Sequence, residues 1–243
     1  MRYPRSMRRV LVLLVVGVST LVFGLLAIVG CIIVPNGNPL LWCARPWAST
    51  ILLASGVRVR TQGRERVPEG PVLYVTNHQS HFDVLALVRS LPGQYRIVAK
   101  KELFAIPVFG WALALAGFIK IDRADREKAI RSLDKAARRM RLGHAVVMFA
   151  EGTRSHDGRL LPFKKGGFVI ALAGACPIVP VTISGSRAVL AKGGREVRSG
   201  TIDVVIGSAI DTRAFEGRRD DLIATTRDAV QAGFTARHAA DLG

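Results

Sequence analysis

Residues 72–83 read VLYVTNHQSHFD, an apolar run that passes directly into polar residues. A continuous apolar run of this kind is typical of a strand that is buried on both faces of a mostly parallel sheet. In open α/β sheets, functional sites lie beyond the carboxyl ends of such strands. The sequence therefore predicts that Asn77 and His78 stand at the functional edge of a sheet.

Similar short runs recur along the chain, and helical stretches separate them. The further expected strands are Val57–Thr61, Arg96–Ala99, Phe118–Ile121, Ala145–Phe149, Ile178–Ile183 and Ile202–Ile206. Apolar residues recur every three or four positions in Ala124–Leu142, and Arg219–Ala240 is expected to form a closing helix. This alternation predicts an α/β fold over residues 58–243, with a mostly parallel central sheet flanked by helices.

The composition restricts the class of protein and of partner. The 243 residues are 49% hydrophobic, which excludes a disordered chain. They include 35 Lys and Arg against 18 Asp and Glu, a formal net charge of +17. This excess favours anionic partners: nucleic acid, phosphorylated small molecules or an anionic membrane surface. Cys31, Cys43 and Cys176 form no CxxC pair, so neither a disulfide framework nor a thiolate zinc site is expected.

Residues 1–57 are expected to form a membrane anchor. Residues 10–34 carry no charge, and about 20 such residues are enough to cross a bilayer as a helix. The basic residues before this segment are Arg2, Arg5, Arg8 and Arg9. A cleaved signal peptide has an apolar region of only about 7–15 residues and a small-residue cleavage site, and the sequence shows neither. We therefore expect a retained helix.

A second apolar segment, residues 40–57, follows a turn signal at residues 35–39. Its Trp42 and Trp47 are expected at the level of the lipid headgroups. Arginines flank both outer ends of the two segments, and basic residues favour the cytoplasmic side. A helical hairpin dipping into the cell membrane places the domain that follows on the cytoplasmic face. Two alternatives stay open: a single crossing, and a second segment that is an ordinary core helix.

His78 and Asp83 are the candidates for acid–base chemistry. On one continuous helix they would lie about 140° apart and could not touch easily. If His78 lies in a loop and Asp83 in the first helical turn, the carboxylate accepts the Nδ1–H and Nε2 takes a proton. The substrate then supplies the nucleophile. Asp83 is alternatively a helix-start residue in a capping box with Ser80. A metal site would need a second group of ligands, which the sequence lacks.

Three other expected strands end in cations or in a glycine-containing turn of the kind that can bind phosphate. The residues at these ends are Lys100 and Lys101, Arg123, and Gly152 with Arg154. Glycine allows a ligand to approach the backbone closely, and arginine grips phosphate with two parallel hydrogen bonds. If these strands are parallel neighbours of the strand before His78, one base and several cations converge on one rim. The alternatives are simple turns and solvated ion pairs at the same positions.

Four blocks stand in order along the chain: NHQSHFD at Asn77–Asp83, GFIKIDR at Gly117–Arg123, EGTR at Glu151–Arg154 and IVPV at Ile178–Val181. Together they resemble the glycerolipid acyltransferase family, most closely the 1-acylglycerol-3-phosphate acyltransferases. The first block matches the family motif N-H-x-S-x-x-D in full, and the third matches E-G-T-R letter for letter. The likeness extends from about residue 58 to residue 208 and includes Lys100–Leu103 and Pro162–Gly166.

The resemblance implies a glycerol-3-phosphate acyltransferase-like fold and a reaction. A fatty acyl group moves from acyl-CoA or acyl carrier protein to the sn-2 hydroxyl of lysophosphatidic acid, giving phosphatidic acid. His78 would take the hydroxyl proton and Asp83 would hold His78, with no bound cofactor or metal. The resemblance implies that six residues bind the glycerol phosphate: Lys100, Arg123, Glu151, Gly152, Thr153 and Arg154. Asn77, Ser80 and Pro180 are expected to support the structure of the site. Ile106–Leu115 is expected to line an acyl tunnel or to dip into the membrane interface, and the alternative is an ordinary core helix.

Three other functions stay in competition. An enzyme of the same fold that acts on glycerol-3-phosphate or another lysolipid would carry the same motifs. A membrane-tethered nucleic-acid-binding protein would need a basic stripe and stacking aromatics, whereas the arginines are spread out and aromatics make up 7%. A serine hydrolase using Ser80 or Ser155 would need a G-x-S-x-G turn, which is missing from the sequence.

Overall fold

The computed structural model describes residues 5–241, so Arg2 and the outer ends of the expected ranges 1–57 and 58–243 lie outside the described residues. Its centre is a seven-stranded sheet with the order β1-β7-β6-β2-β5-β3-β4. The strands are β1 (Val57–Gln62), β2 (Leu73–Thr76), β3 (Tyr95–Lys100), β4 (Ile119–Ile121), β5 (Ala145–Phe149), β6 (Ile178–Ser184) and β7 (Gly200–Ile206). All the expected strands are confirmed, with bounds that agree within two residues.

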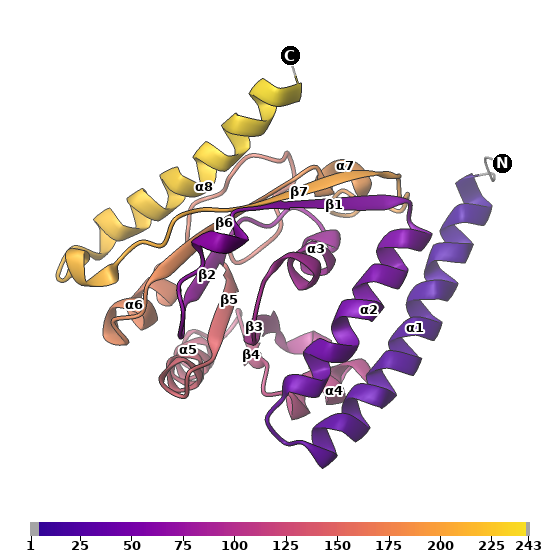
Figure 1. The fold of residues 1–243 in the computed structure, drawn as a ribbon, viewed down its shortest axis with the longest axis horizontal. Coiled ribbons are helices and arrows are strands. Elements are labelled where there is room, and N and C mark those ends of the chain that lie inside the picture. The colour runs from indigo at the N-terminus through magenta and orange to yellow at the C-terminus, as the bar shows by residue number, and fades with distance from the viewer. Residues whose placement is uncertain (1–4, 242–243) are drawn as a thin grey trace.

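Helices cover both faces of this sheet (Figure 1). The α-helices in the described residues are α1 (Arg5–Ile33), α2 (Asn38–Ala54), α3 (Phe82–Ser90), α4 (Phe109–Leu115), α5 (Arg126–Arg141), α6 (Gly166–Ala173), α7 (Ser186–Val189) and α8 (Arg219–Asp241). Short 3-10 helices are η1 (Arg64–Arg66), η2 (Lys101–Ala105) and η3 (Thr212–Phe215). One apolar core lies between the sheet and α2 with α3, and a second lies between the sheet and α5, α6 and α8.

The direction of the strands decides where the loops meet. β6, β2, β5, β3 and β4 run in parallel, whereas β7 pairs antiparallel with β6 and parallel with β1. The expected mostly parallel sheet is therefore confirmed, with a reversed pair at one edge. Thr76 of β2 pairs with Phe149 of β5, so the loops that follow these two strands begin side by side.

α1 and α2 form a helical hairpin beside the domain (Figure 1). Within the described residues, α1 is the helix long and apolar enough to cross a membrane, and most of its side chains are exposed. By contrast, α2 buries Leu41, Ala48, Ile51 and Leu52 in the core shared with the sheet and α3. The second apolar segment thus packs as a core helix as well as an arm of the hairpin. The division of the chain at residue 57 stays a prediction.

Trp47 does not have the surface position expected for it, whereas Trp42 is exposed. The indole N–H of Trp47 donates to Oγ1 of Thr20 on α1 at 3.0 Å. Its ring lies 6.0 Å from that of Phe109 on α4. A hydroxyl on the neighbouring helix satisfies the N–H, so the ring can pack inside and join α1, α2 and α4.

The close approach of α1 to α4 gives a first prediction. A Cβ at Gly24 would lie 2.6 Å from Cγ1 of Val108, whereas a Cβ at Gly17 would have nothing within 4 Å. We expect Gly24→Val to destabilise the fold by about 1–3 kcal/mol, because overpacking strains the contact. Gly17→Val is the matched control on the same helix. Thermal unfolding in detergent measures both, and equal midpoints would contradict the close packing.

Candidate active site

The structure meets the condition under which His78 and Asp83 can touch. His78 lies in the loop after β2, and Asp83 is the second residue of α3. Nδ1 of His78 is 2.7 Å from Oδ2 of Asp83. The Asp83 side chain is fully buried, and that of His78 is 14% exposed. With Asp83 as acceptor, the ring proton stands on Nδ1 and Nε2 is the nitrogen free to take a proton. The catalytic roles of the pair stay predictions.

The same carboxylate also organises the start of α3. Oδ2 of Asp83 accepts the backbone N–H groups of Gln79 at 2.7 Å and Ser80 at 2.8 Å. Both interpretations of Asp83, partner of the histidine and helix-start residue, are therefore satisfied at once. The hydroxyl of Ser80 donates to the carbonyl of Leu190 at 2.7 Å and accepts the N–H of Phe82 at 3.2 Å. Ser80 is thus engaged in structure, as expected for a residue that is not a nucleophile.

Asn77 and Pro180 lie where they can support the loop that carries His78. The Asn77 amide donates to the carbonyl of Ile183 on β6 at 2.9 Å and accepts its N–H at 2.8 Å. Pro180 is buried in β6, one residue before the pairing of Val181 with β7 begins. These contacts tie the end of β2 to its neighbour β6.

Three further contacts fix His78. Its ring stacks on Phe149 of β5, with ring centroids 4.0 Å apart. Its backbone N–H donates to Oε1 of Glu151 at 2.7 Å, and its carbonyl accepts the N–H of Ser155 at 2.8 Å. The EGTR turn therefore holds the backbone of the histidine loop.

Glu151 is occupied by backbone groups. Its other carboxylate oxygen, Oε2, accepts the N–H of Leu161 at 3.1 Å, and the residue is 2% exposed. Burial raises the pKa of Glu151 to about 7, although the two N–H groups act in the opposite direction. The carboxylate thus joins the His78 loop to the loop around residue 161, a role different from the phosphate contact that the family resemblance implies.

A pocket of about 610 Å³ brings the expected cations to the histidine. Its polar end is lined by His78, His81, Lys100, Arg123, Thr153, Arg154 and Lys192. The convergence of the strand ends on one rim is therefore confirmed. Gly152 has φ 70°, a left-handed conformation suited to glycine, and it turns the chain so that Thr153 and Arg154 reach this rim.

The cations of the rim differ in their partners. Lys100 pairs with Glu102 at 3.3 Å, while Lys101 turns away to Asp122 at 2.7 Å. Within the described residues, neither Arg123 nor Arg154 forms an ion pair, so both guanidinium groups are open to an anion.

Lys192 was not predicted from the sequence. Its ammonium donates to the carbonyl of Arg154 at 2.9 Å and to Oγ1 of Thr153 at 3.3 Å. It lies between α7 and β7 in a loop without a motif, and only the return of the chain between β6 and β7 brings it to the rim. No local signal could have identified it.

The other end of the pocket is apolar. Its walls come from α1, α2 and α4 and include Val12, Leu13, Val16, Trp47, Ile51, Phe109 and Leu113. A second cavity of about 70 Å³ continues among the same helices and shares Trp47, Phe109 and Leu113 with the first. Part of the stretch Ile106–Leu115 therefore lines an apolar cavity, and its role as the wall of an acyl tunnel stays a prediction.

The part of the chain that the structure describes contains no cluster of side chains that could bind a metal ion. No three His, Cys, Asp or Glu side chains of the described residues stand close enough together to hold an ion. The expectation of a site without metal stays a prediction.

Comparison with known proteins identifies relatives of this chain. The Acyltransferase family model matches residues 58–184. Relatives named 1-acyl-sn-glycerol-3-phosphate acyltransferase include BAT2 of Brassica napus, 34% identical over 82% of this chain and 63% of the relative. The Saccharomyces cerevisiae relative is 36% identical over 67% of this chain and 55% of its own length. The human alpha form is 35% identical over 72% of this chain and 62% of its own length. The chain thus spans about three fifths of these relatives.

A solved structure shares the fold. The crystal structure of the lysophosphatidic acid acyltransferase PlsC from Thermotoga maritima superposes with a TM-score of 0.84 and 24% identity, covering 97% of this chain and 98% of that one. Sheet, flanking helices and two-helix hairpin together define an acyltransferase fold. This chain belongs to the acyltransferase family.

The buried carboxylate of Glu151 gives a second prediction. Its pKa in the folded protein, about 7, lies above the usual 4.5, so the folded state holds the proton more tightly than the unfolded state. The free energy of unfolding contributed by this group therefore falls as pH rises from about 4.5 to about 7. Glu151→Gln cannot ionise, so the wild type should lose stability relative to this variant as pH rises from about 4.5 to about 7.

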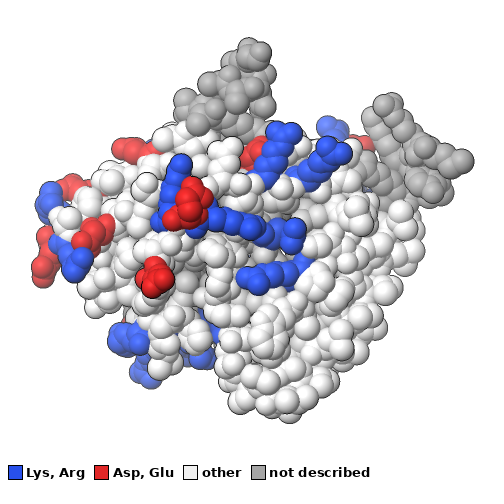
Figure 2. Space-filling model, viewed as in Figure 1, with Lys and Arg blue, Asp and Glu red and all other residues white. Residues whose placement is uncertain are grey.

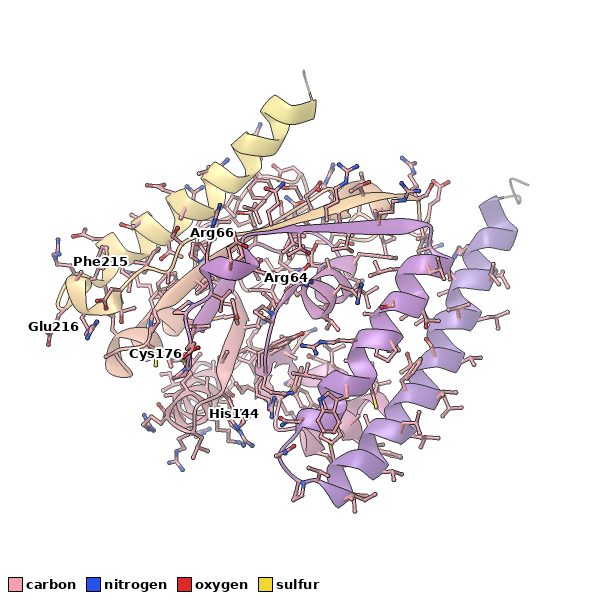
Figure 3. The ribbon with its side chains drawn as sticks, in the orientation of Figure 1. Arg64, Arg66, His144, Cys176, Phe215 and Glu216 are labelled. Atoms are coloured by element: carbon pink, nitrogen blue, oxygen red, sulfur yellow. The ribbon has the colours of Figure 1, made fainter. Side chains whose placement is uncertain are left out.

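Chemical denaturation across this pH range measures the difference. Glu216→Gln is the control, because Glu216 is exposed and lies at the left edge of the molecule in Figure 3. A wild type that gains stability relative to Glu151→Gln as pH rises would mean that the two backbone N–H groups outweigh burial.

Proposed function

We propose that this chain transfers a fatty acyl group from an acyl thioester to the sn-2 hydroxyl of 1-acylglycerol-3-phosphate, giving phosphatidic acid. The observation that carries the proposal is one pocket with two opposite ends. His78, backed by Asp83, stands beside unpaired arginines at one end, and α1, α2 and α4 supply apolar walls at the other. An acceptor with a phosphate, a free alcohol and an acyl chain fits this order of groups. The names of the relatives point to the same substrate.

The histidine acts as general base. Nε2 of His78 takes the sn-2 hydroxyl proton while the oxygen attacks the thioester carbonyl. When the tetrahedral intermediate collapses, the C–S bond breaks and the imidazolium returns the proton to the sulfur, so ester and thiol are the products. Asp83 stays ionised and stabilises the imidazolium. Positioned general-base catalysis of this kind contributes about 10²–10⁴-fold to the rate.

The rim cations hold the phosphate of the acceptor. A phosphomonoester carries nearly two negative charges, and arginine meets it with two parallel hydrogen bonds. Arg123 and Arg154 are the arginines of this rim, and neither has an ion partner in the described residues, while Lys100 and Lys192 add positive charge. Lys192 also holds the backbone of Arg154, which limits the freedom that the arginine loses on binding. A related acceptor with a similar headgroup is the alternative that these residues also permit.

The exposed apolar face of α1 anchors the enzyme to the cell membrane, with the catalytic domain on the cytoplasmic face. In Figure 2 the surface over α1 and α2 carries no coloured charge in its described part, while Lys and Arg gather on the domain beside it. A lipid acceptor then enters the pocket from the membrane between α1 and the rim. The acyl donor, acyl-CoA or acyl carrier protein, arrives from the aqueous side as a co-substrate, and no bound cofactor or metal takes part.

Removal of the base gives the third prediction. His78→Ala should lower kcat for acyl transfer about 10²–10⁴-fold, because the alcohol loses its proton acceptor. Asp83→Asn should also lower kcat strongly, because the amide no longer stabilises the imidazolium. Thiol release from acyl-CoA in the presence of lysophosphatidic acid measures both. His156→Ala, at an exposed histidine outside the pocket, is the control. Transfer by purified His78→Ala at the wild-type rate would falsify the mechanism.

The phosphate contact gives the fourth prediction. Arg154→Gln should raise the KM for lysophosphatidic acid about 10–100-fold, since a hydrogen bond to a charged group contributes about 1.5–3 kcal/mol. The KM for the acyl donor should stay the same. Assays of glycerol-3-phosphate, lysophosphatidic acid and lysophosphatidylcholine with one donor test the acceptor. A faster reaction with either of the other two acceptors would replace the proposed substrate.

A further inference from the structure

A second pocket lies at the amino end of β4, whereas His78 follows the carboxyl end of β2. It measures about 260 Å³ and opens between the last turns of α5 and the turn that joins α4 to β4. Its lining residues are Gly117, Phe118, Ile119, Lys135, Arg138, Arg139 and Leu142. Because Gly117–Ile119 is the amino end of β4, this α5 pocket shares no cation with the catalytic rim, although Phe118 lines both pockets.

The α5 pocket gathers cations without carboxylate partners. On the preceding turns of α5, Lys128 pairs with Asp125 at 2.9 Å and Arg131 with Glu127 at 3.6 Å. In the described chain, no such pair includes the three cations of the pocket, Lys135, Arg138 and Arg139. Cations at a helix C-terminus interact favourably with the helix dipole. The helix dipole alone does not explain why three cations line the same pocket.

A buried arginine adds to this charge. Arg96 on β3 is 1% exposed and donates to the carbonyls of Asn36 at 2.7 Å and Tyr95 at 2.9 Å, while its Nε has no partner in the described residues. Burial and then the charge of Arg139 lower the pKa of Arg96. Burial, Arg96 and Arg139 also lower the pKa of His144, labelled in Figure 3 between α5 and β5. The fold thus holds like charges together, an arrangement that an anion in the pocket would stabilise.

The surroundings of the α5 pocket favour a lipid over a soluble anion. Leu142 in its wall is 69% exposed, and Leu115 and Trp111 on α4 are 48% and 57% exposed. Helix α4 packs against α1, whose outward side chains are apolar along its length. The pocket is therefore joined to the membrane-facing surface by exposed apolar side chains. In Figure 2, Lys and Arg appear at the lower edge, over α5, beside that uncharged surface.

We propose that the α5 pocket binds the headgroup phosphate of an anionic phospholipid in the membrane that α1 contacts. Arg138 and Arg139 hold the phosphate oxygens and Lys135 adds a third positive charge. The acyl chains of this lipid lie along Leu115 and Leu142. The lipid is not a reactant, because the pocket lies at the amino end of its strand and His78 follows the carboxyl end of another parallel strand. This site does not depend on the proposed acyl transfer.

The test is thermal unfolding of the full chain in dodecylmaltoside micelles that contain phosphatidylglycerol or phosphatidylcholine. Phosphatidylglycerol should raise the unfolding midpoint of the wild type, and phosphatidylcholine should not. Arg138→Gln with Arg139→Gln should remove this rise and weaken phosphatidylglycerol binding about 30-fold, since each cation near anionic lipid contributes about 1 kcal/mol. Lys128→Gln with Arg131→Gln, at paired cations of the same helix, is the matched control and should keep the rise.

Stability without anionic lipid separates binding from a structural role. The Arg138→Gln, Arg139→Gln variant should unfold at no lower temperature than the wild type, because repulsion from Arg96 is relieved. If that variant does not fold, Lys135→Gln with Arg138→Gln is the second variant, because it keeps Arg139, whose guanidinium lies against Gly117. It should show the same loss of the rise with phosphatidylglycerol. An equal rise in the wild type, pocket variant and control, or an equal rise with phosphatidylcholine, would overturn the proposal. So would inorganic phosphate alone giving the full rise, which would assign the pocket to a soluble anion.

Discussion

The hydrogen bonds to one buried oxygen, Oδ2 of Asp83, are the contacts on which the rest of the site depends. This oxygen meets the imidazole of His78 and the backbone N–H groups of Gln79 and Ser80. A buried carboxylate oxygen needs donors, and the start of α3 supplies two of them to Oδ2, whereas Oδ1 of Asp83 has no hydrogen-bond partner in the described residues. The helix start and the orientation of the histidine are therefore fixed by the same atom. Disturbing either one disturbs the other.

The helical hairpin of α1 and α2 and the loop that carries His78 line one and the same pocket. Parallel strands bring the cations of separate loops to one rim, while Val12, Leu13 and Val16 of α1 form part of the same wall. Helix α1 therefore supplies part of the wall of the pocket that contains His78. In the proposed function, the phosphate of an amphiphilic substrate would meet the cations and its acyl chain the apolar side chains, with its alcohol beside the imidazole.

Local sequence patterns predicted much of this arrangement. Continuous apolar runs predicted the strands, and the spacing of His78 and Asp83 allowed a contact if His78 lay in a loop and Asp83 in the first turn of a helix. Other features depend on contacts between distant segments. The reversal of β7 and the arrival of Lys192 at the rim follow from chain topology, which no local pattern encodes. The backbone partners of Glu151 come from loops more than seventy residues and ten residues away. Apolar content alone could not separate a core helix from a membrane helix in α2.

The central claim is that the alcohol of a lipid acceptor reaches His78 while its phosphate lies against the rim arginines. A crystal structure of the full chain with 1-acylglycerol-3-phosphate bound tests it most directly. We expect the sn-2 oxygen within about 2.6–3.2 Å of Nε2 of His78, and the phosphate in contact with Arg123 and Arg154. A phosphate seated away from both arginines, or an sn-2 oxygen that faces away from the imidazole, would contradict the account.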